Sequence, residues 1–227
     1  MTQDERNALK RWEEHHKALA ADVPVEDWLS QSEIDKKRKK LEEDPIKWIK
    51  YFFPKYAKYE FAPFHVRAIK RVIEHDEWYE VLSWSRELAK STVAMFICMY
   101  LALTKRKRFF VLASATIDSA KRLLAPYKIN FESNPRIRQF YGSQVTLGQW
   151  TDGEFTAKCG AKFVALGAGS APRGARNEEV RPDVIYMDDY DTDEDCRNPE
   201  TLKKKWYWFE ASLYPTRSIC SQFSLDS

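Results

Sequence analysis

Short apolar runs alternate with amphipathic stretches along the middle of the chain. Residues 79–84 and 108–113 have the length and apolar character of buried strands, and residues 91–104 between them have helical spacing. A second helix is predicted from about residue 118 to 131, where Asn134-Pro135 stops it. Strands that alternate with helices are typical of crossover units on a parallel sheet. We therefore predict an α/β fold with a mainly parallel sheet flanked by helices.

The pattern changes in the second half of the chain. Asp152-Gly153 and Cys159-Gly160 separate two strand-like runs within residues 149–167, which predicts an antiparallel β-hairpin at the edge of the sheet. Residues 183–187 form a further apolar strand that leads into acidic residues. Asn198-Pro199-Glu200 then has the order of residues that begins a helix, which we expect to continue to about Ser212.

The N-terminal region, residues 1–57, is rich in Lys, Glu and Trp and contains no Gly. Breaks at Pro24, Pro45 and Pro54 predict three or four short helices, one of them capped by Asp44 with Pro45 in its first turn. We expect a basic stretch at residues 36–40 to be a solvated helix face, although it could also touch phosphates. The predicted organisation is a helical region at 1–57, an α/β domain at 58–220 and a tail at 221–227.

Composition narrows the class of protein. The chain has 227 residues, 44% of them hydrophobic, and a formal net charge of +3, so no strong overall field would attract nucleic acid. Its four cysteines form no C-x-x-C pair and have no zinc spacing with the four histidines. No apolar run approaches the roughly 20 residues of a membrane span. These features predict a soluble cytoplasmic protein that is not secreted, with reduced thiols.

The segment after the first predicted strand has the context of a phosphate-binding loop. Residues 83–92 (SWSRELAKST) connect a strand to an amphipathic helix, and such a loop surrounds phosphates with backbone N–H groups at a helix N-terminus. Lys90 would then reach the β- and γ-phosphates, and the Ser91 hydroxyl would join a magnesium shell. The generic motif has Gly where Trp84 and Ala89 stand, so a chance A-K-S-T at a helix start is the alternative.

The acid strand supplies the second half of such a site. Residues 184–189 (VIYMDD) place Asp188 and Asp189 at a strand tip, where magnesium bound to a nucleotide needs oxygen ligands. Acidic residues from Asp189 to Glu200 also have part of the spacing of an EF-hand calcium loop, but Glu194 stands where that loop needs Gly. A solvated acidic turn at residues 191–195 is the simpler interpretation.

The stretch Ser85-Arg86-Glu87-Leu88-Ala89-Lys90-Ser91-Thr92-Val93 resembles the deviant phosphate loop of phage terminase large subunits. Similar elements in the family's order extend over about residues 60–215. The resemblance implies a P-loop NTPase fold of the ASCE type, with residues 85–92 contacting the nucleotide. Arg86 would neutralise charge on the γ-phosphoryl group, Asp188 would bind magnesium through its shell, and Asp189 would orient the attacking water. Most relatives have Glu at that last position.

Two flanking elements also resemble this family. Phe64 and His65 occupy an aromatic-Pro-Phe-His element that lies against adenine in terminases, so Phe64 would stack on the base and His65 would contact it. A histidine beside core aromatic residues is otherwise a structural residue. Arg173, in the Gly-rich residues 167–176, resembles the arginine that reaches the ATP of a neighbouring subunit in the ring. A loop arginine that binds DNA or an acidic partner is the alternative.

The expected function is that of an ATPase motor domain that hydrolyses ATP with Mg²⁺ to drive viral DNA into a procapsid. Its partners would be double-stranded DNA, the portal protein, the small terminase subunit and further copies in a homo-oligomeric ring, docked transiently on the procapsid in the host cytoplasm. A complete terminase continues with a coupling strand carrying small hydroxyl residues and a nuclease domain. Residues 221–227 do not resemble that strand, so we expect a truncated chain without nuclease activity.

Two other functions remain open. A helicase-like nucleic-acid ATPase would share the sheet, but its Gly-rich phosphate loop and Asp-Glu-x-Asp/His signature are absent. A non-catalytic nucleic-acid or capsid adaptor could retain a degenerate phosphate loop as scaffold, as Ala89 and Asp189 suggest.

Overall fold

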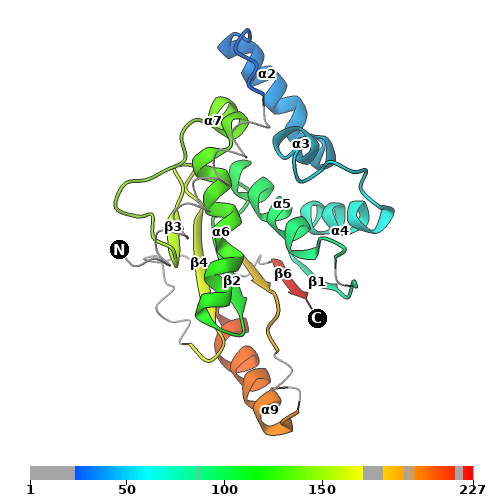
Figure 1. The fold of residues 1–227 in the computed structure, drawn as a ribbon, viewed down its shortest axis with the longest axis vertical. Coiled ribbons are helices and arrows are strands. Elements are labelled where there is room, and N and C mark those ends of the chain that lie inside the picture. The colour runs from blue at the N-terminus through cyan, green and yellow to red at the C-terminus, as the bar shows by residue number, and fades with distance from the viewer. Residues whose placement is uncertain are drawn as a thin grey trace, which may run out of the picture.

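The protein is built around one twisted, mainly parallel β-sheet (Figure 1). The computed structural model describes residues 24–85, 87–170, 181–191, 195 and 197–217, together with the backbone of 222–226. Six strands form the sheet in the order β1-β6-β5-β2-β4-β3. All neighbouring strands are parallel except β3 and β4. The strands are β1 (Trp78–Leu82), β2 (Phe109–Ser114), β3 (Glu154–Thr156), β4 (Lys162–Gly167), β5 (Val184–Met187) and β6 (Gln222–Asp226).

Helices flank this sheet, which confirms the predicted α/β class. The described helices are α2 (Gln31–Glu42), α3 (Pro45–Phe52), α4 (Pro63–Glu74), α5 (Lys90–Leu103), α6 (Ile117–Ser133), α7 (Pro135–Tyr141) and α9 (Pro199–Trp208). A π-helical turn, η2 (Phe209–Leu213), and a 3₁₀ turn, η3 (Tyr214–Thr216), follow α9. Helices α2 and α9 lie at opposite ends of the long axis of the molecule (Figure 1). None of the described helices is both long and apolar enough to cross a lipid bilayer.

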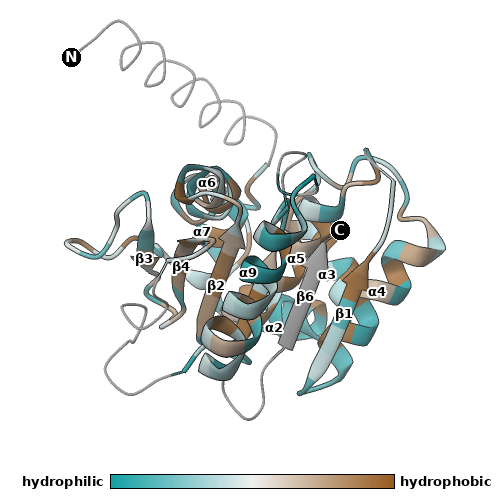
Figure 2. Cartoon of the chain, turned by 90° about the horizontal axis from the view of Figure 1, so that it is seen from below, coloured by the Kyte–Doolittle hydropathy of each residue, from teal (hydrophilic) through white to brown (hydrophobic). Residues whose placement is uncertain are grey.

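Both faces of the central strands are buried. Along β2, Phe110 and Leu112 join the main core under α5 and α6, whereas Phe109 and Val111 join a second core that includes Phe209 of η2. This division follows from the two-residue period of a strand, whose successive side chains point to opposite faces. The strands are accordingly apolar along their length, and hydrophilic residues lie on the outer helix surfaces (Figure 2).

Helix α5 is the core helix of the main layer. All its residues from Val93 to Leu103 are buried, although the sequence pattern predicts only one inner face. Its outer side is covered by α3 and α4, and the side chains of Trp48, Phe52 and Phe53 from this region are at most 1% exposed. The described part of residues 1–57 therefore shares its hydrophobic core with the sheet.

The predicted helix start at Asp44 is confirmed. Its carboxylate accepts hydrogen bonds from the N–H groups of Ile46 at 3.0 Å and Lys47 at 3.2 Å, with Pro45 in the first turn of α3. These bonds satisfy two of the N–H groups that a helix leaves unpaired at its start.

The basic stretch on α2 has the solvated character that the sequence predicts. Lys36, Lys39 and Lys40 are exposed. Lys37 instead pairs with Glu26 at 2.5 Å, and Arg38 donates to the carbonyl of Phe140 at 3.0 Å. These two residues fasten α2 to the rest of the molecule.

The hairpin prediction is also confirmed. Strand β3 pairs antiparallel with β4 and forms one edge of the sheet. Gly153 and Gly160 lie in the turns before each of these strands, and Gly160 has the positive φ of 93° that favours glycine.

The expected tail at residues 221–227 is wrong for most of its length. Gln222–Asp226 forms β6, which pairs parallel with β1 on one side and with β5 on the other. Apolar residues alternate with polar ones in QFSLD, a short pattern typical of a strand. The backbone groups of β1 and β5 give this segment two rows of hydrogen-bond partners, so a tertiary interaction fixes its structure.

Candidate functional site

The loop between β1 and α5 has a strained backbone at two described positions. Glu87 has φ 69° and Ala89 has φ 58°, a left-handed conformation that L-residues other than Asn and Asp rarely adopt. Ala89 stands where the generic phosphate loop has Gly, and its backbone takes the conformation for which Gly is suited. Ala89 therefore departs from the motif in sequence but keeps the backbone conformation that the motif's glycine would adopt. Arg86 lies outside the described residues.

The N-terminus of α5 opens from this loop. Ala89 is the N-cap residue, and it makes no side-chain hydrogen bond to the first turn. N–H groups at a helix start have no partner within the helix, and the helix dipole adds partial positive charge there. The first turn, Lys90 to Thr92, thus presents the chemistry that binds an anion.

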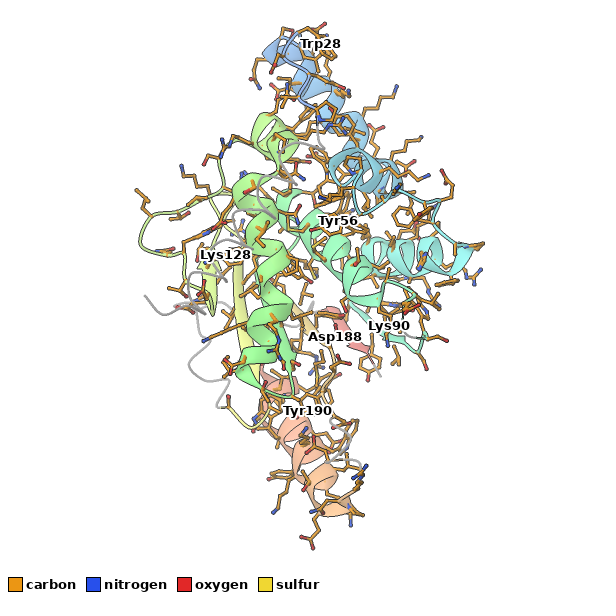
Figure 3. All side chains as sticks on the ribbon, in the orientation of Figure 1. Trp28, Tyr56, Lys90, Lys128, Asp188 and Tyr190 are labelled. Atoms are coloured by element: carbon orange, nitrogen blue, oxygen red, sulfur yellow. The ribbon has the colours of Figure 1, made fainter. Side chains whose placement is uncertain are left out.

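The most specific contact joins this helix to the acid strand. The Ser91 hydroxyl donates a hydrogen bond to Oδ2 of Asp188 at 2.5 Å, across 97 positions of sequence. Asp188 directly follows β5 and is only 9% exposed, whereas Ser91 is exposed. Lys90 and Asp188 lie at the same end of the sheet (Figure 3), because the carboxyl ends of parallel strands share one edge. The two halves of the predicted site therefore meet.

Asp188 receives a second hydroxyl that the sequence analysis does not identify. The Tyr186 hydroxyl donates to the same Oδ2 atom at 2.9 Å, and this tyrosine is only 1% exposed. Tyr186 and Asp188 are two residues apart, and side chains with this spacing lie on the same side of an extended backbone. That spacing is the only signal in the sequence, and it is too common to identify the contact.

Asp189 lies beside this contact with an exposed side chain. Its backbone has φ 45°. The N–H of Ala115 and the hydroxyl of Ser114 donate to its carbonyl at 3.2 and 3.4 Å. The end of β2 thus holds the turn in which the acid strand ends.

Aromatic residues border the phosphate loop. Phe64 and His65 lie in the first turn of α4, and their rings pack on Trp84 at centroid distances of 4.9 and 5.1 Å. His65 Nδ1 accepts from the N–H of Ala62 at 3.2 Å, so Nε2 carries the proton and donates to the carbonyl of Leu88 at 3.0 Å. Both predicted residues therefore adjoin the loop, and His65 has a structural role there. Trp84, which the sequence analysis treats only as a departure from the motif, completes the cluster.

A lysine pairs with the two described aspartates of the acidic turn that follows the strand. Lys205 of α9 donates to the carbonyl of Tyr190 at 2.8 Å and forms ion pairs with Asp191 and Asp195. The hydroxyl of Tyr190 in turn donates to the carbonyl of Lys205 at 3.2 Å. A cation at this position disfavours calcium binding. The two hydrogen bonds also bring α9 into contact with Tyr190, the residue after Asp189.

The donor atoms near Asp188 suit magnesium only in company with a nucleotide. Ser91 and Asp188 offer hydroxyl and carboxylate oxygens, the hard ligands that Mg²⁺ prefers. Within the described part of the chain, no three His, Cys, Asp or Glu side chains lie together in a group that could hold a metal. Magnesium commonly keeps several waters and binds one or two carboxylates plus phosphate oxygens, and this pair fits that mode.

Arg173 lies outside the described residues, as does most of the Gly-rich segment around it. Gly167 ends β4, and a Cβ atom there would lie 2.6 Å from the backbone nitrogen of Ile117, so this glycine allows β4 to approach the start of α6. Ser170 accepts a hydrogen bond from the indole of Trp208 at 2.8 Å. Gly167 therefore lies at the carboxyl edge of the parallel strands, the edge where Asp188 lies.

The sequence matches no model of a known protein family. No curated protein matches it either. The geometry of the site is therefore the basis for assigning a function.

Proposed function

We propose that this chain is the ATPase motor domain of a phage terminase large subunit, with a P-loop NTPase fold of the ASCE type. The observation that carries the proposal is the hydrogen bond from Ser91 to Asp188. It joins a strained loop at a helix N-terminus to the tip of an acid strand, the arrangement that a magnesium nucleotide requires. Strand β6 lies beside the acid strand, where the resemblance to terminases puts the coupling strand.

Each residue of the site then has a chemical role. The N–H groups of the loop and of the first turn of α5 bind phosphate oxygens, and Lys90 adds a positive charge at the β- and γ-phosphates. Ser91 and Asp188 hold the magnesium shell. Magnesium, when bound, neutralises charge on the phosphate oxygens. Asp189 orients the attacking water from the exposed tip of the strand.

The remaining roles follow from the resemblance and from the aromatic cluster. Arg86 stabilises charge on the γ-phosphoryl group, and Arg173 reaches the nucleotide of the next subunit in a ring. Phe64 stacks on adenine, whereas His65 holds Leu88 and thereby the phosphate loop. The ring would act on double-stranded viral DNA at the portal protein, together with the small terminase subunit.

The direct test measures ATP binding and magnesium-dependent hydrolysis by the purified chain. We expect Lys90→Ala to weaken ATP binding at least tenfold, because it removes the positive charge that faces the triphosphate. Asp188→Ala should remove the magnesium dependence, because it removes the carboxylate that faces the metal shell. Lys128→Ala is the matched control. Lys128 lies on α6 away from Lys90, and it pairs with Asp152 at 2.8 Å (Figure 3). Equal ATP affinity in the Lys90 and Lys128 variants would show that the proposed site is wrong.

Further outcomes separate the alternative functions. Nucleotide binding without turnover would favour the non-catalytic adaptor. Stimulation of hydrolysis by single-stranded nucleic acid, and not by portal on a procapsid, would favour the helicase-like ATPase. In an assembled ring, Arg173→Ala should lose turnover while it keeps nucleotide binding, and unchanged turnover would exclude its role across subunits.

A further inference from the structure

The carboxylate of Asp188 is held by two hydroxyl groups on one oxygen. Ser91 and Tyr186 both donate to Oδ2, at 2.5 and 2.9 Å. Ser91 is exposed at the mouth of the site, whereas Tyr186 is buried in the main core behind it. We propose that Tyr186 is a positioning residue, which fixes the orientation of the Asp188 carboxylate for the binding of magnesium nucleotide. The inference rests on the proposed function of this site.

An aspartate carboxylate can rotate about the bond that joins it to the side chain. Its terminal torsion is broad and roughly two-fold, so a single hydrogen bond from the exposed Ser91 leaves the plane of the carboxylate poorly defined. A second donor in a fixed position removes that freedom. Because both donors engage Oδ2, the other oxygen of Asp188 is the one available to the magnesium shell of the proposed site.

Tyr186 is itself held firmly enough to act in this way. Its backbone lies in β5, between β2 and β6, where it pairs with Leu112 on one side and Ser224 on the other. Its ring is 1% exposed within the main core. A donor placed on a central strand is fixed more precisely than one on a loop.

The geometry also directs the Ser91 proton. Because this hydroxyl donates to Asp188, its oxygen lone pairs point away from the carboxylate and remain available to a cation. A carboxylate that could rotate would accept this proton only part of the time. Tyr186 therefore acts on both oxygen ligands of the magnesium shell through its hydrogen bond to Asp188.

The test uses ADP binding, which does not depend on turnover. Loss of a partner behind a metal-binding side chain typically weakens metal affinity by about 10–100-fold. For Tyr186→Phe we expect ADP affinity in magnesium to fall about tenfold, the lower end of that range, since Asp188 keeps its bond to Ser91. ADP affinity in EDTA should stay as in the wild type, because the phosphate loop is untouched.

Tyr127→Phe is the matched control. Tyr127 is 1% exposed in the same core. Burial raises the pKa of its hydroxyl, and nearby Cys98, Tyr186 and Asp188 add to this rise. Among the described residues its hydroxyl makes no hydrogen bond to Asp188. Loss of this hydroxyl should therefore leave the ratio of ADP affinities with and without magnesium unchanged. Calorimetric titration of the full chain, with thermal melting to verify folding, measures both variants.

Three results decide the matter. A reduced magnesium effect in Tyr186→Phe, with a wild-type effect in Tyr127→Phe, supports the positioning role. A wild-type magnesium effect in Tyr186→Phe overturns it, while loss of that effect in Asp188→Ala would leave the proposed function intact. If magnesium does not change ADP affinity in the wild type, or if Lys90→Ala binds ADP as the wild type does, both proposals fail.

Discussion

Ala89 has a left-handed backbone conformation, which is unfavourable for a residue with a Cβ atom. A left-handed φ costs an L-residue roughly 1–2 kcal/mol, whereas Gly adopts it freely. Gly also gains entropy in the unfolded chain, which offsets part of this benefit. The strain at φ 58° is therefore a small cost at the position that the phosphate loop needs for its turn.

We predict that Ala89→Gly raises the free energy of unfolding by about 0.5–1 kcal/mol, the difference between relieved strain and added unfolded-state entropy. Ala94→Gly is the control, since Ala94 lies inside α5 and a helical Gly costs about 1 kcal/mol relative to Ala. Urea unfolding of both variants measures the two values. If Ala89→Gly destabilises the chain as much as the control does, the left-handed backbone at residue 89 is incorrect.

At the scale of elements, two asparagines cap helices with the same geometry in different surroundings. Asn134 caps α7 through bonds to the N–H groups of Arg136 and Ile137, both at 3.1 Å, and it is 3% exposed. Its amide also donates to the carbonyl of Phe52 at 2.8 Å, which joins α3 to the α6–α7 junction. Asn198 caps α9 in the same way on the exposed surface.

Asn134→Ala should cost about 3 kcal/mol, because it removes a cap worth about 1 kcal/mol and leaves a buried carbonyl without its donor. Asn198→Ala should cost only about 0.5–1 kcal/mol, since water replaces the lost bonds at an exposed cap. Chemical denaturation compares the two free energies of unfolding. Equal losses would mean that the bond to Phe52 contributes nothing to stability.

The sequence pattern predicts most elements because their signals are local. Asp44-Pro45 and Asn198-Pro199 each contain both the cap and the first-turn proline, and helices begin at both. Asn134-Pro135 is predicted only to stop a helix, but α7 also begins there. The run at residues 109–113 is apolar throughout, as expected of a strand buried on both faces. By contrast, β6 has a weak pattern, and its structure depends on partners that are distant in sequence.

The same division applies to the site. Lys90, Ser91 and Asp188 are predictable because a phosphate loop and an acid strand have recognisable neighbours in sequence, and the structure brings Ser91 to Asp188. Tyr186 and Lys205 are not predictable in this way, since a buried tyrosine and a half-buried helical lysine are common residues with many roles. Only the fold shows that one donates to Asp188 and that the other binds the turn after Asp189.

At the scale of the whole molecule, the core beneath the site sets a limit to stability at alkaline pH. Burial raises the pKa of the Cys98 thiol from its usual value of 9.0 to about 12, and burial likewise raises the pKa of Tyr127 well above its ordinary range. Between pH 9 and 12 the thiol of Cys98 ionises in the unfolded chain but not in the folded one. Its contribution to stability is therefore complete below pH 9 and is lost as the pH rises.

At pH 10 this linkage should lower the free energy of unfolding by about 1.4 kcal/mol, the value of one pKa unit. Between pH 7.5 and 10, the free energy of unfolding of Cys98→Ala should fall by about 1.4 kcal/mol less than that of the wild type. The cavity in this variant lowers its stability at both pH values and does not change the comparison. Urea titrations at the two pH values give the comparison. Parallel losses in both chains would show that the thiol ionises alike in the folded and unfolded states.

The place of β6 between β1 and β5 affects the order in which the molecule assembles. Among the described strands, β1 is hydrogen-bonded to β6 alone, and β6 is synthesised after every other described element. On the ribosome, the strand that leads into Lys90 must wait for the last of these segments before it can join the sheet, whereas β5 can already pair with β2. The end of β5 that carries Asp188 can thus form early. The phosphate loop after β1 takes its place next to it only when β6 inserts between β1 and β5.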